Sequence, residues 1–442
     1  KDYYNYIVKR MENQLTYGLY MSVNNIKNEH FTTLEWFRFI LSLYIVIFHT
    51  FNYSTAPTWI RDFFDTGFFA TSSFFILSGF ILAHVYLKNK GTPQVVMREP
   101  TKDFFIKRFA NLYPIHIISM ILFMIVLVAI PYANINPNDT GVGLRAVTLD
   151  ATNGVPYSEL RHVMSNTELV IAILMNIFMI QSWNAYYMMF NFPTWSISTL
   201  FFFYLVFPYA AIKIHQLKKP YFFLFILNAV ALIPVVLCLM YTDMGNPEAG
   251  FLHRNPIVRL PEFLGGILLC HIYHQNKLNN KLPNTWGMVK LFILIVILLT
   301  AMRSFLYAMT NYWDSWFIAY HLLHNGLILS LEMLMIYFIV NLPQINNDRI
   351  NYWGERLGNS SLPLFALHIP IYSVFSRIHK LLSGNPSLCF EDFRGCVAAA
   401  TVAPDYRYYL LYLIVTIIVC VYFQEKIVVP IRKTIINHGI KK

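Results

Sequence analysis

Apolar residues occur along this 442-residue chain in runs of about twenty, separated by short polar segments. A run of this length, wound as a helix, matches the thickness of the hydrocarbon core of a bilayer. Ten such runs are present, at 33–55, 63–87, 104–131, 196–213, 221–241, 257–275, 288–307, 321–341, 359–380 and 407–425. The pattern therefore predicts an all-α polytopic integral membrane protein with about ten transmembrane helices.

A shorter apolar run at 168–183 decides the topology. If it does not cross the membrane, 23 of the 34 Lys and Arg residues fall on one side, which the positive-inside rule makes the cytoplasmic one. We therefore predict ten crossings with both termini cytoplasmic, and a re-entrant or interfacial segment at 168–190. The domains expected are a cytoplasmic N-terminal segment at 1–32, a transmembrane domain at 33–433 and a cytoplasmic tail at 434–442.

Composition supports this interpretation. Hydrophobic residues make up 56% of the chain and charged residues 13%, and the mean hydropathy is +0.47, which excludes an ordinary soluble globule. The net charge of +11 is compatible in principle with nucleic-acid binding, but the basic residues are spread over short loops between apolar runs. We expect membrane lipids and no nucleic acid as partners, in a bacterial inner membrane or a eukaryotic endomembrane.

Two longer polar segments, 132–167 and 381–406, fall on the outer side in this topology and are long enough to shape a binding surface. The second contains Cys389 and Cys396, which we predict to form a disulfide bond. The other three cysteines lie in apolar spans and are expected to be packing residues.

The first predicted span contains Glu35, Arg38 and His49. Arg38 and His49 are eleven positions apart, so they project from nearly the same helix face, about 16 Å apart along the axis. The structural interpretation is an arginine that reaches the interface and a histidine bonded to a neighbouring helix. Ionisable residues are rare inside membranes and often functional, so a functional interpretation stands beside it.

Two further motifs place polar or small residues next to spans. FFILSGFIL, from Phe74, contains Ser78 and Gly79, where a helix can approach another backbone closely. KDFFIKRFANLYP contains four residues that either anchor the span or form a cradle for an anionic ligand such as a cofactor phosphate. These four are Lys102, Lys107, Arg108 and Tyr113.

Later spans carry their own polar residues. RLPEFLGG places Arg259 and Glu262 in the first turn of a helix, where they are expected to pair. LGNSSLPLFALHIPIY places His368 inside a span, two residues before the helix-kinking Pro370.

Taken in order with WSIS…FYLVFP and FQEKIVVPIR, these motifs resemble the membrane acyltransferase-3 family over residues 33–433. The resemblance implies a core of about ten transmembrane helices. It also implies an acyl-CoA-dependent O-acyltransferase that moves an acyl group, most often acetyl from acetyl-CoA, to a hydroxyl of a cell-surface polysaccharide or other glycan, a lipid-linked sugar or a small molecule. Two positions depart from the family pattern: Asn111 stands where a second cation is usual, and Leu200 where a carboxylate is usual. Glu35 and Glu262 are then the candidates for a nearby carboxylate.

Acyl transfer from a thioester to a hydroxyl needs a base, which we expect to be His49. Arg38 is expected to hold a phosphate or the pantetheine arm, and His368 to orient the site or stabilise the oxyanion. The nucleotide end of acetyl-CoA would bind the Lys107–Arg108 segment at the cytoplasmic mouth. Ser196 as an acylated nucleophile is a less favoured alternative.

No metal is expected. His321 with His324, and His271 with His274, have a spacing that could place two imidazoles on one ion, but no cysteine or carboxylate pattern in the sequence completes a site. Two other function classes compete with the enzyme: a transporter or lipid flippase with Arg38 and His49 as a relay, and a non-catalytic membrane scaffold.

Overall fold

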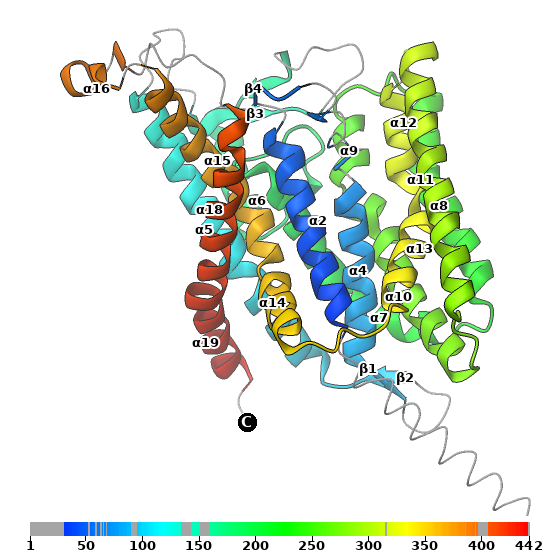
Figure 1. Ribbon diagram of the computed structural model, residues 1–442. Coiled ribbons are helices and arrows are strands. Elements are labelled where there is room, and N and C mark those ends of the chain that lie inside the picture. Colours follow the sequence, from blue (N-terminus) through cyan, green and yellow to red (C-terminus); the bar gives the residue numbers. More distant parts are fainter. Residues whose placement is uncertain are drawn as a thin grey trace, which may run out of the picture.

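The computed structural model describes residues 31–51, 54–57, 60, 61, 64, 66, 67, 69–89, 95–133, 143–150, 159–313, 316–384, 386–393, 395, 396 and 405–440. Almost all of the predicted N-terminal segment 1–32 lies outside these residues. The described chain is a bundle of long helices with two small strand pairs at opposite ends (Figure 1).

The longer helices are α2 (Thr32–Thr50), α4 (Phe69–Tyr86), α5 (Thr101–Ala133), α7 (Trp195–His215), α8 (Pro220–Tyr241), α10 (Pro256–Leu278), α11 (Thr285–Trp313), α15 (Ser361–Ser383) and α18 (Tyr409–Phe423). The shorter helices are α6 (Asn166–Ile177), α9 (Glu248–Arg254), α12 (Trp316–Leu322), α13 (Leu329–Val340), α14 (Asp348–Asn359), α16 (Leu388–Glu391) and α19 (Val429–Gly439). The 3-10 and π turns are η2 (Gly143–Arg145), η4 (Gln181–Trp183), η5 (Phe192–Thr194), η6 (Leu323–Leu327), η7 (Tyr406–Tyr408) and η8 (Gln424–Val428).

Within the described residues, nine helical segments are long and apolar enough to cross a membrane, or ten if one bent pair counts as a single span. They coincide with the ten predicted spans, so the all-α polytopic fold is confirmed. The predicted span 321–341 differs in one respect: it is two helical pieces, 317–327 and 329–340, that meet at 55°. Asn325 and Gly326 leave helical geometry at the break, and Gly326 has a φ of +136°, which only glycine adopts readily.

Helix α6 is twelve residues long, about 18 Å, and is too short to cross. It begins with a capping box in which Ser165 and Glu168 bond each other's backbone N–H groups. These hydrogen bonds from Ser165 hold the pKa of Glu168 below its ordinary value, so the box stays formed at neutral pH. The chain then returns through η4 and η5 to the start of α7, as expected for a re-entrant or interfacial segment.

The strands form two antiparallel pairs. β1 (Leu87–Asn89) pairs with β2 (Val95–Met97), with Leu87 opposite Met97, and β3 (Ala146–Thr148) pairs with β4 (Arg161–Val163), with Ala146 opposite Val163. We call the end with β1, β2, α14 and the C-terminus the lower end, and the end with β3, β4, α9 and α16 the upper end (Figure 1).

Helices α4 and α10 form the centre of the bundle, while α8 and α11 lie at its edge. Inside the protein, 72% of the α4 span and 83% of the α9–α10 span are buried, against 17% of α8 and 11% of α11. The apolar side chains exposed on α8 and α11 are therefore suited to contact lipid.

Two glycines let α4 and α10 cross closely. A Cβ on Gly79 would collide with the backbone carbonyl of Phe263, and one on Gly266 with that of Ile76. Such close crossings by small residues are typical of helices packed in membranes. The FFILSGFIL stretch of α4, called the SGF motif below, is therefore a packing motif, as its sequence indicated.

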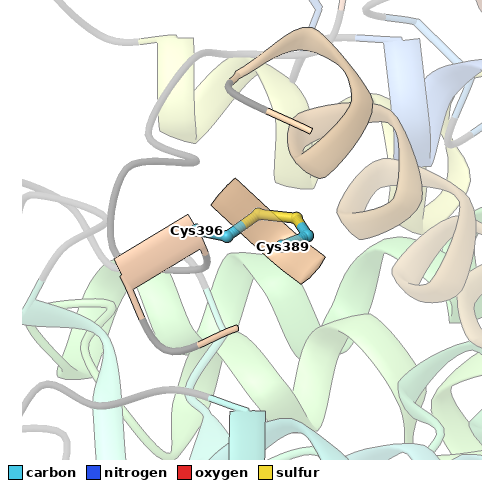
Figure 2. Close-up of a disulfide and its surroundings, with 2 residues drawn as sticks. All are labelled: Cys389 and Cys396. Atoms are coloured by element: carbon cyan, nitrogen blue, oxygen red, sulfur yellow. A yellow bond between two sulfur atoms is a disulfide. The ribbon is translucent and has the colours of Figure 1, made fainter. Parts of the chain in front are cut away.

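The predicted disulfide joins Cys389, in α16, to Cys396 at the upper end (Figure 2). The other three cysteines form no disulfide in the structure.

Candidate functional site

The fold brings His49, in the last turn of α2, against His368 in α15. His49 Nδ1 lies 2.9 Å from His368 Nε2, and the two rings are nearly parallel with centroids 5.1 Å apart. His368 is fully buried, whereas His49 is partly exposed. Of the catalytic residues expected from the sequence, these two meet across 319 positions of the chain.

The hydrogen bonds of this pair assign its protons. His368 Nδ1 lies 2.9 Å from the carbonyl oxygen of Leu364, which can only accept, so Nδ1 carries the proton. In a neutral His368, Nε2 then accepts from Nδ1 of His49, which leaves Nε2 of His49 as an unprotonated base. The pair is thus arranged so that His49 can take a proton from a third group.

A proline in α15 fixes the surroundings of His368. Pro370 has no N–H, so the carbonyl of Ala366 loses its helical donor. The side-chain amide of Asn191 replaces it, with Nδ2 2.6 Å from Ala366 O. The ring of the next residue, Phe192, lies nearly perpendicular to the His49 ring, with centroids 5.6 Å apart. The carbonyl that Pro370 leaves free therefore anchors the turn of Asn191 and Phe192 beside His49.

Two tyrosines of α18 hold the same region from the other side. The hydroxyl of Tyr412 donates to the backbone carbonyl of His368 at 3.0 Å. The hydroxyl of Tyr409 lies 2.6 Å from Oγ1 of Thr50, the residue that follows His49. Helix α18 thus forms hydrogen bonds with the backbone of His368 and with the residue that follows His49.

Arg38 lies lower on α2 and is engaged locally. Its Nη1 is 2.9 Å from Oε2 of Glu35, and both side chains are largely buried. Gly358, near the end of α14, packs directly on Glu35, where a Cβ would collide with the carboxylate. The structure therefore pairs Arg38 with Glu35, about 16 Å along the helix axis from His49.

The four residues expected to bind the cofactor lie on the first turns of α5, at the lower end. Arg108 Nη2 donates to the hydroxyl of Tyr86 at 2.6 Å, and its guanidinium lies 5.0 Å from the centre of that ring. Lys107 forms an ion pair with Glu99. Lys102 is exposed, and Tyr113 stacks on Phe109 with centroids 4.6 Å apart. Arg108, Lys107 and Tyr113 thus each contact a different side chain, whereas Lys102 is exposed.

The two departures from the family pattern have different surroundings. Leu200 is buried in the apolar core, at 3% exposure, so no polar group replaces the missing carboxylate at that position. Asn111 is partly buried on α5, three residues after Arg108.

A second buried polar cluster, not foreseen as a unit, surrounds Arg259 at the start of α10. Its guanidinium contacts Glu262 at 2.7 Å, Ser72 at 2.6 Å, and both Nδ1 and the carbonyl oxygen of His324 at 2.9 Å. The expected Arg259–Glu262 pair is confirmed. Glu332 adds a second carboxylate and accepts from Ser73 at 3.3 Å.

Asp150 links the outer β3 segment to α9. It accepts a hydrogen bond from His253 at 2.6 Å and forms an ion pair with the buried Arg254. The His253 ring lies 4.9 Å from Trp195 and 5.8 Å from His324, so it connects this pair with the Arg259 cluster. Sequence reasoning missed Asp150 and His253, since Asp150 is an isolated acidic residue in a polar loop.

Ser196 is the alternative nucleophile, and its position gives that role no support. Its Oγ donates to the carbonyl of Pro193 at 2.8 Å inside the first turn of α7. Thr194 occupies the N-cap position of α7, and Ser196 is the second residue of the helix. His116 of α5 bonds the carbonyl of Asn176 in α6 at 2.8 Å, which is a structural contact.

Comparison with known proteins places this site in a family. Residues 31–425 match the family described as an acyltransferase domain, Acyl_transf_3. No curated protein and no solved structure matches the chain. The match covers nearly the whole chain, including both histidines and the basic segment of α5, and the chain therefore belongs to the acyltransferase-3 family of membrane acyltransferases.

Proposed function

We propose that this protein transfers an acyl group, most simply acetyl, from acyl-CoA to a hydroxyl group, with His49 as the general base. The observation that carries the proposal is the hydrogen bond between His49 Nδ1 and His368 Nε2. Because Leu364 accepts from the other nitrogen of His368, Nε2 of His49 is the basic atom of the pair.

In the reaction, Nε2 of His49 takes the proton of the acceptor hydroxyl as its oxygen attacks the thioester carbonyl. The carbon–sulfur bond then breaks, an ester forms, and His49 returns the proton to the CoA sulfur. His368 orients His49 and shares the positive charge that develops on it. Both nitrogens of His368 are engaged, which favours the orienting role over direct contact with an oxyanion.

The donor is expected to bind from the lower end. Arg108 and Lys107 lie there, and the basic loops favour a cytoplasmic location for that end. The Cys389–Cys396 disulfide lies at the upper end, and disulfides persist mainly in oxidising compartments. The acceptor is therefore proposed to be an extracytoplasmic glycan, lipid-linked sugar or small molecule.

The geometry gives less support to a transporter in which Arg38 and His49 act as a relay. Arg38 pairs with Glu35 and His49 with His368, so the two proposed relay groups belong to separate contacts. A non-catalytic scaffold would need neither the assigned base nor a CoA site.

The test is turnover of acetyl-CoA by detergent-purified protein supplied with candidate hydroxyl acceptors. Replacing His49 with alanine should lower turnover by about 10²- to 10⁴-fold, the usual cost of losing a general base. His438→Ala, which removes an exposed histidine in α19, serves as the control and should keep full turnover. Near-full turnover in His49→Ala would show that the base has been assigned wrongly.

A further inference from the structure

A third histidine cluster lies at the lower end, where α4 and α10 finish. It consists of His84 in the last turn of α4 and of Cys270 and His274 in α10. One ligand atom from each side chain lies within 4.8 Å of the other two. We propose that these three side chains bind a zinc ion.

The distances fit a tetrahedral site. Zinc bonds of about 2.0–2.1 Å to nitrogen and 2.3 Å to sulfur put ligand atoms about 3.4 to 3.6 Å apart. His84 Nδ1 is 3.1 Å from His274 Nε2, and Cys270 Sγ is 3.9 Å from each nitrogen of His274. All three ligand atoms lie within 4.8 Å of one another, so small side-chain movements would bring them onto one ion.

The sequence hides this site because its ligands come from two helices. Cys270 and His274 are four residues apart, so they share one face of α10. His84 is 190 positions from His274 and meets it only through the close crossing of α4 and α10. The i, i+3 pair His271 and His274 drew attention in the sequence, but His271 instead bonds the carbonyl of Leu217 at 3.1 Å.

The donor set selects the class of metal. One thiolate and two imidazoles suit zinc and other thiophilic ions, whereas magnesium and calcium require oxygen ligands. An imidazole pair at 3.1 Å could also be a simple hydrogen bond. The thiol of Cys270 beside that pair is the additional donor that a metal site requires, and it is fully buried.

A pocket of about 190 Å³ lies next to the cluster at the lower end, lined by Phe31, Tyr273 and Lys277 among others. Phe31 also contacts His84, with ring centres 5.0 Å apart, so one side chain links the pocket wall to the cluster. Three protein ligands leave a fourth position for water or for His215, whose ring centre is 6.2 Å from that of His274. The ion would join the ends of the two central helices.

The experiment uses the full chain, purified in detergent and stripped of metal. One sample is titrated with Zn²⁺, and another with Co²⁺ as a spectroscopic substitute. We expect about one ion per chain and a thiolate-to-cobalt charge-transfer band in the near ultraviolet. Cys270→Ser should abolish that band, and His274→Asn should weaken binding at least about 10-fold. The matched controls are Cys420→Ser, a buried cysteine in α18, and His271→Asn, the neighbouring histidine in α10.

Zinc should also raise the unfolding temperature of the wild type and of both controls, but not of Cys270→Ser. The shift is measured for each protein against its own metal-free form. A variant that is less stable than the wild type can therefore still be compared. Absence of stoichiometric binding in the wild type would overturn the proposal, and so would a cobalt band that survives in Cys270→Ser.

Discussion

At the scale of single residues, the candidate site depends on groups that replace missing hydrogen bonds. Pro370 removes the helical donor to Ala366, and Asn191 supplies another one at 2.6 Å. A buried carbonyl left without a donor costs about 1–3 kcal/mol. Asn191 therefore has a structural role: it anchors the turn whose next residue, Phe192, contacts the His49 ring.

Replacing Asn191 with alanine should accordingly destabilise the protein by about 1–3 kcal/mol. The same change in a Pro370→Ala background should cost less, by at least about 1 kcal/mol, because residue 370 can then donate to Ala366. Unfolding of the four proteins in the same detergent measures this coupling. Costs that simply add would show that Asn191 does not replace the donor that Pro370 removes.

His49 and His368 could be predicted from the sequence as separate candidates, because each interrupts an otherwise apolar run. Their contact could not, since it depends on how α2 and α15 pack across 319 positions. The pairing of Arg38 with Glu35 could have been predicted from the sequence, because Glu35 lies one helical turn away. Asp150 was not, because only the folded outer segment brings it to His253.

At the scale of elements, the crossing of α4 and α10 determines the centre of the bundle. Apolar length alone located these spans, and the small residues of the SGF motif indicated a close approach. The break at Asn325–Gly326 was not predicted, although Asn-Gly is a strong turn signal, because the surrounding run is apolar enough for a continuous span.

A matched pair of adjacent glycines tests the crossing. Gly266→Ala should destabilise the protein by about 1–3 kcal/mol or more, because the new Cβ meets the backbone of Ile76. Gly265→Ala should be better tolerated, since its Cβ meets side chains rather than backbone, the nearest being those of Met333 and Leu329 at 3.2 and 3.3 Å. Thermal unfolding in detergent compares the two, and equal shifts would contradict the close crossing as the cause.

At the scale of the whole molecule, the two ends differ in chemistry. The start of α5, which follows β2 at the lower end, carries Arg108 and Lys107. The upper end, with α16, α9 and β3 (Figure 1), carries the disulfide and the Asp150–His253 pair. Under the proposed function, the thioester arm of acyl-CoA must extend from the lower end towards His49, near the upper end of α2.

Acetyl-CoA should therefore raise the unfolding temperature of the wild-type protein, and the shift should shrink in Arg108→Ala. A ligand at about 100 times its Kd stabilises the folded state by about 2.7 kcal/mol, which such a measurement detects. Lys102→Ala, which removes an exposed cation on the same helix, should retain more of the shift. No shift in the wild type would count against an acyl-CoA donor.

The break between α12 and α13 has an electrostatic consequence. A helix that stops inside the bundle leaves backbone carbonyls without intrahelical donors, and its dipole places partial negative charge at that point. The carbonyl of His324 belongs to this break and accepts from Arg259 at 2.9 Å. The guanidinium of Arg259 therefore contacts a helix terminus as well as Glu262, so the backbone shares with that carboxylate the task of balancing a buried positive charge.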